Sequence, residues 1–337
     1  MARRTGGRTI ILESCPSIKG YAAVVSEKEG EGPLGREFDM VGTDAYFGEK
    51  TWEKAESHIQ REAMRRALDK AGIPPSQIDV VFAGDLLNQC IGSAYAVRGM
   101  DAPFIGLYGA CSTMAESLAL AALFVDCGIA GCAAAATSSH FCSAERQFRF
   151  PLEYGGVRTP TSQWTVTGGG AAVVTSGDVA PFVREVCFGK VNDLGGTDIN
   201  NMGAAMAPAA ADTIAQYFSD TLTTADNYDM IFTGDLGYVG SELLCELLSR
   251  DGIELGKKHM DCGKLIYDKK QQVEAGGSGC GCSASVLCSY IASRVRRGEW
   301  RSVLFVATGA LMSPISCQQG ESIPGIAHLV RLSAVKT

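Results

Sequence analysis

The chain has 337 residues, with 30 Lys and Arg against 37 Asp and Glu, so its formal net charge is −7 at pH 7. Apolar residues make up 46% and charged residues 20%, which is ordinary for a soluble globular protein and excludes a disordered chain, a collagen and a coiled coil. This acidic balance leaves no broad basic face, so we expect no nucleic-acid partner.

The first predicted elements alternate between helix and strand. Residues 51–71 carry apolar side chains at helical spacing, and Gly72 ends this predicted helix. Residues 80–83 are all apolar and too few for a helix, which predicts a strand buried on both faces. A second strand is predicted over 103–107. We therefore expect helices packed against a mostly parallel sheet.

The stretch 117–136 has nearly the length of a membrane-spanning helix and a single charge, at Asp126. A charge in the middle of a span is costly, and Gly128 favours a helix, a turn and then a buried strand. We expect a soluble core segment here rather than a span.

The second half repeats the alternation. A helix is predicted to begin near Ser241 and to end at Gly252, and another covers 283–297. A buried strand follows at 303–307. The order of elements again indicates an α/β fold.

Two sequence echoes indicate an internal duplication. Residues 79–86 (DVVFAGDL) return as 229–236 (DMIFTGDL), and each run ends in Gly-Asp-Leu. In a second pair, Cys111 precedes Thr137 by 26 residues, just as Cys282 precedes Thr308. We predict two β/α halves related by a pseudo-twofold axis, 1–178 and 179–337.

The thirteen cysteines do not suggest a disulfide framework. Their number is odd, the chain is long, and its first residues are basic and polar rather than the apolar core of a signal peptide. We expect reduced thiols and synthesis in the cytoplasm.

Cys111 is the sharpest candidate for chemistry. It follows a predicted strand and a glycine turn and opens a predicted helix, where the field of the helix N-terminus would lower the pKa of its thiol. Such a thiol suits nucleophilic catalysis, although a small buried residue beneath a tight turn explains the position equally.

Polar side chains at the ends of predicted strands form a second group of candidates. Asp85 and Asp235 each end a strand, where open α/β folds bind ligands; each is either a pocket carboxylate or a structural cap. His140 ends the strand after the Cys111 helix, so it is expected in the same crevice or as a hydrogen-bonded loop residue. Arg146 and Arg149 are candidate anion partners or exposed loop residues.

Two further motifs give weaker signals. The loop 276–283 (GGSGCGCS) approaches a helix and could receive a carboxylate, but it is neither a P-loop nor a dinucleotide fingerprint. His259 lies near Asp261 and Cys262, yet one residue of each type does not make a closed zinc site, so we expect no metal there.

Read whole, the chain resembles the thiolase fold of thiolases and ketoacyl synthases, and more specifically the bacterial stage V sporulation protein AD family. The segments that carry this resemblance are EGPLG at 31–35, GDLLNQ at 84–89, GACST at 109–113, ATSSH at 136–140, AERQFR at 144–149, EYGG at 153–156, MGAAMAP at 202–208, GGSGC at 276–280 and IPGIAH at 323–328. They cover almost the whole chain.

The resemblance implies a five-layer α-β-α-β-α fold, a homodimer formed at the strand edge of the first half, and no enzymatic activity. It implies a protein that binds dipicolinic acid (pyridine-2,6-dicarboxylate) for its uptake into the developing spore and its release in germination. Membrane channel proteins of the same spore machinery are the implied partners, at the spore inner membrane with which the chain would associate peripherally. No cofactor is expected; Ca²⁺ enters, if at all, with the ligand.

Comparison with the related enzymes supports binding over catalysis. In those enzymes a His or Asn from the second half assists the Cys, at places that match Asp235 and the loop around Cys280. Neither place holds a His or an Asn here. Two alternatives stay open: an acyl-transferring enzyme that uses Cys111 with an unusual base, and a scaffold that has lost its ligand.

The expected ligand-binding residues come from loops at strand ends and from the glycine-rich wall opposite them. They are Asp85, Cys111, Ser112, Ser139, His140, Arg146 and Gly309. Asp85 would repel a dianion unless calcium bridges the two, so it is either a calcium contact or a structural group.

Overall fold

The computed structural model describes residues 1–148 and 158–336. One sheet path of ten strands runs through the molecule. The first half contributes, in spatial order, β3 (Ser17–Val25), β9 (Gly168–Thr175), β7 (Cys132–Ser139), β5 (Val80–Gly84) and β6 (Phe104–Gly106). The second half contributes β10 (Phe182–Cys187), β15 (Gly325–Ser333), β14 (Ser302–Ala310), β11 (Met230–Thr233) and β12 (His259–Asp261).

The two sets of strands have the same topology. In each set the first strand pairs antiparallel with the second, the second antiparallel with the third, and the last two pairings are parallel. β3 and β10 join the sets through the pair Ser17 and Phe182. The predicted duplication into pseudo-twofold halves is thus present in the fold, whereas the predicted boundary after residue 178 stays a prediction.

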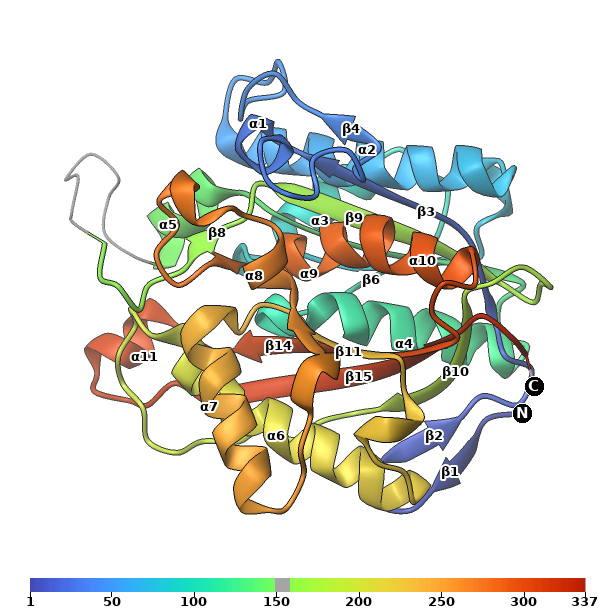
Figure 1. Cartoon of the computed structure of the whole chain (residues 1–337). Coiled ribbons are helices and arrows are strands. Elements are labelled where there is room, and N and C mark those ends of the chain that lie inside the picture. Colours follow the sequence, from blue (N-terminus) through green and yellow to red (C-terminus); the bar gives the residue numbers. More distant parts are fainter. Residues whose placement is uncertain (149–157, 337) are drawn as a thin grey trace.

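Helices cover both faces of each set of strands and form a shared central layer (Figure 1). The outer helices are α2 (Trp52–Ala71) and α3 (Ile91–Val97) on the first half, and α6 (Met202–Thr221) and α7 (Gly237–Arg250) on the second. Between the halves lie α4 (Thr113–Asp126), α9 (Cys280–Val286), a π-helical turn (Leu287–Ile291) and α10 (Ala292–Arg296). The expected α-β-α-β-α layering is confirmed.

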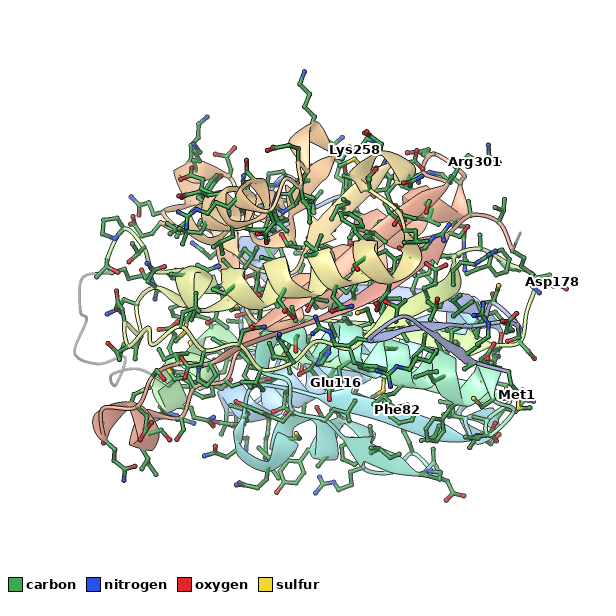
Figure 2. The ribbon with its side chains drawn as sticks, turned by 90° about the horizontal axis from the view of Figure 1, so that it is seen from below. Met1, Phe82, Glu116, Asp178, Lys258 and Arg301 are labelled. Atoms are coloured by element: carbon green, nitrogen blue, oxygen red, sulfur yellow. The ribbon has the colours of Figure 1, made fainter. Side chains whose placement is uncertain are left out.

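Successive side chains along each strand point to opposite faces of the sheet, and so each strand contributes to two layers of the core. On β3, Ala22 and Val24 pack in the outer cluster with α2, while Ala23 and Val25 pack in the central cluster with α4. Figure 2 shows Phe82 of β5 inside the outline of the molecule, whereas Met1, Asp178 and Arg301 lie near its edges. Each sheet is therefore buried on both faces, which explains why its strands read as unbroken apolar runs.

Shorter elements complete the fold. The remaining helices are α1 (Glu27–Gly30), α5 (Phe141–Phe148), α8 (Cys262–Leu265) and α11 (Pro314–Gln318). The remaining strands are β1 (Arg3–Thr5), β2 (Thr9–Ile11), β4 (Met40–Val41), β8 (Trp164–Thr165) and β13 (Gly277–Ser278). β8 and β13 pair in a separate two-stranded ribbon that brings one segment of each half together.

Most predicted elements appear at their predicted places. α2 begins after Thr51, whose side chain accepts a hydrogen bond from the Lys54 amide, and ends at Gly72 in the left-handed conformation. The predicted start of the next half's outer helix near Ser241 is wrong, because α7 begins at Gly237. Asp261, 24 residues away, accepts the Gly237 amide and thereby caps a helix start that has no local signal.

The apolar stretch 117–136 folds as a helix, a turn and a strand, as predicted. α4 ends at Asp126, whose carboxylate accepts the Ser14 amide and hydroxyl, and β7 begins at Cys132. Within residues 1–148 and 158–336, no helix combines the length and the apolar character needed to cross a bilayer.

Candidate functional site

Cys111 lies in a strained turn at the start of α4. The preceding residue, Ala110, has a φ of 50°, a left-handed conformation that is costly for a residue with a side chain. Hydroxyls hold the turn: Ser112 Oγ donates to the Gly109 carbonyl at 2.6 Å, and Thr113 Oγ1 donates to the Ala110 carbonyl at 2.7 Å. The turn leaves Cys111 partly exposed, with its thiol directed toward the second half.

β14 of the second half packs directly against this turn. A Cβ atom on Gly309 would lie 2.3 Å from the Gly109 carbonyl oxygen and 3.3 Å from the Cys111 amide nitrogen. Only a glycine permits this approach of two backbones. Gly309 therefore lies beside Cys111, at the junction of the two halves.

Asp235, at the end of β11, is the ionisable neighbour of Cys111 across this junction. The buried carboxyl of Asp235 accepts hydrogen bonds from the Gly279 amide (2.9 Å), Ser278 Oγ (3.0 Å) and Thr308 Oγ1 (2.8 Å). The negative charge of this carboxyl acts on the Cys111 thiol across the junction. Burial raises the pKa of Asp235, and the donated bonds oppose that rise.

Burial, and then the negative charge of Asp235, raise the pKa of the Cys111 thiol well above its ordinary value. The prediction that the helix N-terminus lowers this pKa is therefore wrong. A helix terminus supplies only a partial positive charge, and here a full carboxylate and the loss of water outweigh it. At neutral pH the thiol stays protonated.

A small cavity of about 60 Å³, partly open to solvent, adjoins Cys111. Its walls come from both halves and combine aromatic rings, methionines and a few polar groups: Leu86, Tyr108, Ala110, Cys111, Ala144, Glu145, Phe148, Thr165, Met202, Met206, Ser278, Ala310 and Met312. The β8–β13 ribbon supplies its two hydroxyls, from Thr165 and Ser278.

One carboxyl lies in the cavity wall itself. Glu145 of α5 is almost fully buried; it accepts a hydrogen bond from Thr165 Oγ1 at 3.3 Å and pairs with Arg158 at 3.4 Å. With Asp235 behind Ser278, two acidic groups thus border the cavity.

Asp85 does not line this cavity. Its buried carboxyl accepts the Leu87 amide (2.9 Å), the Ser93 amide (2.7 Å) and Ser93 Oγ (2.6 Å), all from its own half. These bonds fix the loop between β5 and α3. Although Asp85 and Asp235 are equivalent in the duplication, it is the charge of Asp235 that raises the pKa of the Cys111 thiol.

Ser139 and His140 are buried and are not among the residues that line the cavity. Ser139 Oγ donates to the Val166 carbonyl at 2.7 Å and accepts the Gly281 amide at 3.1 Å. His140 Nε2 lies 2.8 Å from the Ala45 carbonyl, and its Nδ1 accepts the Cys142 amide. Burial lowers the pKa of His140, so its ring is neutral and both nitrogens are occupied.

Arg146 lies on the surface of α5. Its guanidinium pairs with Glu53 and packs 5.0 Å from the ring centre of Trp52, beside a separate surface pocket. Arg149 lies outside the described residues. Of the seven expected ligand-binding residues, the structure brings Cys111, Ser112 and Gly309 together at the junction of the two halves. The ligand-binding role of each of the seven stays a prediction.

Sequence reasoning missed most of the cavity wall. Tyr108, Phe148 and the three methionines carry no motif, since they lie on different elements that only the fold brings together. The one available signal is the resemblance of the segments 144–149 and 202–208, which contain Phe148, Met202 and Met206.

Comparisons with known proteins agree with this fold. The family model described as Stage V sporulation protein AD (SpoVAD) matches residues 6–333. Stage V sporulation protein AD of Bacillus subtilis (strain 168) is 48% identical over 326 residues, which cover 96% of each chain.

Among solved structures, one of OleA from Xanthomonas campestris has a TM-score of 0.60 at 13% identity and covers 98% of this chain and 99% of its own. The 3-oxoacyl-[acyl-carrier-protein] synthase III of Aquifex aeolicus VF5 has a TM-score of 0.51 at 12% identity, with 94% and 99% covered. Both are similar in fold alone. From the family match and the identity to the Bacillus subtilis protein, we conclude that the chain belongs to the stage V sporulation protein AD family.

Proposed function

We propose that this chain binds dipicolinic acid in the cavity beside Cys111, without catalysis, for the uptake of that compound into the developing spore and its release in germination. The observation that carries the non-catalytic part is the placement of the Cys111 thiol, where burial and the negative charge of Asp235 raise its pKa. A nucleophilic cysteine needs a base that removes its proton, whereas this carboxyl makes that proton harder to remove.

The composition of the cavity wall supports the same proposal. No histidine is among the described residues that line the cavity. His140 is bonded to backbone groups on both ring nitrogens and so offers no free base. Condensing chemistry would also need donors aimed at a developing oxyanion, a role for which neither Asp235 nor Glu145 is suited.

The side chains that line the cavity suit an aromatic ligand. Tyr108 and Phe148 offer ring faces for a pyridine, and Met202, Met206 and Met312 adapt to its edge. Glu145 is paired with Arg158, whereas the Asp235 carboxyl behind Ser278 is held by neutral hydrogen-bond donors, so a free dianion would meet repulsion from Asp235. A calcium chelate of dipicolinate carries no such net charge, and we therefore propose that Ca²⁺ enters with the ligand.

The proposal includes a homodimer at the first-half edge. β6 pairs with β5 on one side, and no described strand pairs with its other side. Ile105 in β6 is 39% exposed, as an interface residue would be in the isolated chain. Light scattering after gel filtration tests this: Ile105→Lys should convert a dimer to a monomer, whereas a wild-type monomer would contradict the proposal.

We also propose that the chain associates peripherally with the spore inner membrane and contacts membrane channel proteins there. Membership of the family is the only ground for these two parts of the proposal. Co-sedimentation of the chain with inner-membrane vesicles, with and without those channel proteins, would test both parts.

Protection of Cys111 from a maleimide tests where the ligand binds. Saturating dipicolinate with Ca²⁺ should slow the labelling of Cys111, measured by peptide mass spectrometry, and leave the exposed Cys127 unaffected. Equal slowing at both sites, or at neither, would contradict binding in this cavity. An acyl adduct on Cys111 after incubation with acyl-CoA would instead favour the acyl-transferring alternative.

A further inference from the structure

The outer helices α2 and α6 are the same element of the duplicated unit. Both have 20 residues, and the step from one helix to the other is 150 positions at both ends, from 52 to 202 and from 71 to 221. The same step separates the repeated segments 79–86 and 229–236. The two helices can therefore be compared position by position.

The two helices turn different surfaces to solvent. An outer helix normally carries charged or polar side chains on the face away from the core. The exposed positions of α2 follow this rule and include Lys54, Arg61, Arg65 and Asp69. The corresponding positions of α6 hold Ala204, Ala211, Ala215 and Ser219. Ser219 is exposed and the three alanines are partly exposed, so core packing does not account for the lack of charged side chains on this face.

The small side chains of α6 form the floor of a surface groove of about 540 Å³. Leu247, Arg250 and Asp251 near the end of α7 lie in one wall, and the loop that precedes α6 supplies Leu194. A second hollow of about 370 Å³ shares Leu194 and Pro208 with the groove and extends it toward the start of α6. In Figure 2, α6 is the yellow helix that lies across the face turned to the viewer. The groove is therefore open to another molecule along most of this helix.

The rim of the groove exposes large apolar side chains. Leu194 is 76% exposed, and Val191, three residues before it, is 55% exposed. Scattered apolar residues are ordinary on a protein surface, but a continuous apolar surface of this kind marks an interaction site. A partner in the groove would remove this surface from water.

The charges around the groove favour a basic partner. Asp251 lines the groove and Asp198 lines its extension, and neither has an ion-pair partner in the described part of the chain. Arg250 in the wall is already paired with Glu246, and Asp212 is paired with two basic residues. A second copy of this chain would bring the same acidic rim against itself, because a closed dimer uses the same patch on both copies. The groove therefore suits a partner that carries Lys or Arg.

We propose that the groove binds an amphipathic helix of a membrane channel protein, with apolar side chains against the alanines and Lys or Arg beside Asp198 and Asp251. Small side chains let two helix axes approach to about 8 Å, the lower end of the usual range. Apolar residues at helical spacing on the partner would then fill the groove. Segments of membrane proteins that flank their spans on the cytoplasmic side carry an excess of Lys and Arg. The inference rests on the part of the proposed function that includes these channel proteins, and it names the surface that they contact.

The groove and the Cys111 cavity share α6 as a wall. Met202 and Met206 line the cavity from one side of this helix, while Ala204 and Pro208 line the extension of the groove from another side. Because a helix is about 10 Å across, a partner in the groove would lie at about that distance from the proposed ligand.

The test transfers the surface of α2 to α6. Ala211→Arg together with Ala215→Arg gives α6 the residues that α2 has at positions 61 and 65, and because arginine is a good helix former the fold should be kept, which thermal melting checks. Binding is measured by co-sedimentation of the full-length chain with inner-membrane vesicles that contain the channel proteins. The double variant should bind at least about tenfold more weakly than the wild type, because two long cations fill the groove and repel a basic helix. Asp251→Lys should also weaken binding, and less so at high salt.

The matched control is Arg61→Ala together with Arg65→Ala, which makes the opposite change on α2 and should leave binding unchanged. Equal binding of the wild type and the α6 double variant, or an equal loss in both double variants, would overturn the proposed groove. If the α6 double variant instead lost binding to vesicles that lack the channel proteins, the groove would bind lipid. If it converted a dimer to a monomer, the groove would bind a second copy. Either result would overturn the proposed partner.

Failure of the proposed function gives a different result. A wild-type chain that does not sediment with vesicles containing the channel proteins would contradict the membrane part of the proposed function, and this partner with it. Calorimetric titration with dipicolinate and Ca²⁺ should give the same result for the wild type and both double variants, because none of the four substituted residues lines the cavity.

Discussion

The buried carboxyl of Asp235, from the second half, raises the pKa of the Cys111 thiol, from the first half. In a duplicated α/β fold this is where the ends of corresponding strands and helices from the two halves meet. A catalytic site would place a base at this junction. Here an acid occupies it, and that acid holds the thiol in its protonated form.

Replacing Asp235 should make Cys111 more reactive. Asp235→Asn removes the charge that raises the thiol pKa but leaves its burial, so the pKa should fall yet stay above the ordinary value. Each unit of this fall increases the thiolate fraction about tenfold at a pH below the pKa. The pH dependence of Cys111 alkylation, followed by mass spectrometry, measures it, and an unchanged pH profile would contradict the account.

Gly309→Ala should disturb the same junction by steric pressure. The new Cβ would lie 2.3 Å from the Gly109 carbonyl oxygen, so β14 and the Cys111 turn must separate, at a cost of about 1 to 3 kcal/mol in unfolding free energy. Urea denaturation measures that loss. Gly196→Ala is the matched control, because nothing lies within 4 Å of its Cβ position. Equal effects of the two changes would rule out the contact as the cause.

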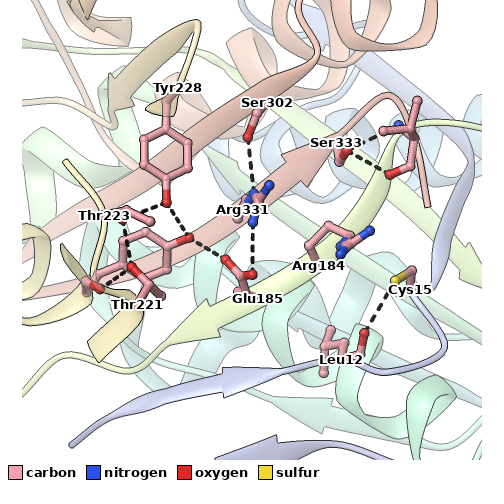
Figure 3. Close-up of polar contacts among 12 residues, drawn as sticks. Leu12, Cys15, Arg184, Glu185, Thr221, Thr223, Tyr228, Ser302, Arg331 and Ser333 are labelled. Atoms are coloured by element: carbon pink, nitrogen blue, oxygen red, sulfur yellow. Dashed lines mark hydrogen bonds and ion pairs between the residues drawn. The ribbon is translucent and has the colours of Figure 1, made fainter. Parts of the chain in front are cut away.

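The second half is stabilised by a largely buried ion pair between β10 and β15. Figure 3 shows Arg331 between Ser302 and Glu185; the guanidinium lies 2.9 Å from the Glu185 carboxylate, which also accepts the Tyr217 hydroxyl. Glu185→Ala leaves the Arg331 charge without its partner and should cost about 3 kcal/mol of unfolding free energy. Urea denaturation measures this cost.

The control for that ion pair is Arg65→Ala. Arg65 pairs with Glu62 and Asp69 on an exposed helix face, so its loss should change stability far less. A similar loss in the two variants would contradict the importance of burial at Glu185.

His328 should make stability depend on pH. Burial lowers its pKa to about 4 in the folded chain, from about 6.5 when unfolded. Between these values the unfolded chain binds more protons, so stability falls with falling pH, by at most about 1.4 kcal/mol per pH unit from this residue. His328→Gln should flatten the dependence of unfolding free energy on pH between about 6.5 and about 4. A slope that stays the same in the variant would assign the dependence to other groups.

Local signals in the sequence predict most of the fold. α2 has an apolar stripe, a Thr cap and a final Gly, and β5 is an apolar run that only a sheet covered on both faces can bury. The predicted start of α7 is wrong because the Asp261 side chain that caps this helix comes from a distant element. Capping by a residue 24 positions away leaves no local pattern.

The candidate site can be predicted only in part, and for a similar reason. Cys111 and Gly309 are found because a helix start and a repeated strand end are local patterns. The direction in which the pKa of the Cys111 thiol shifts cannot be predicted in this way, because it depends on Asp235, which lies 124 positions away in the sequence. His140 shows the opposite case: its place at a strand end suggests a functional role, but the fold directs both its nitrogens to backbone groups.

Calorimetric titration of the purified chain with dipicolinate, with and without Ca²⁺, tests the central claim most directly. The account predicts saturable binding that is stronger with Ca²⁺ and that pyridine-2-carboxylate, which lacks the second carboxylate, does not reproduce. Absence of heat and of any thermal shift under all conditions would contradict the claim and favour a scaffold without a ligand.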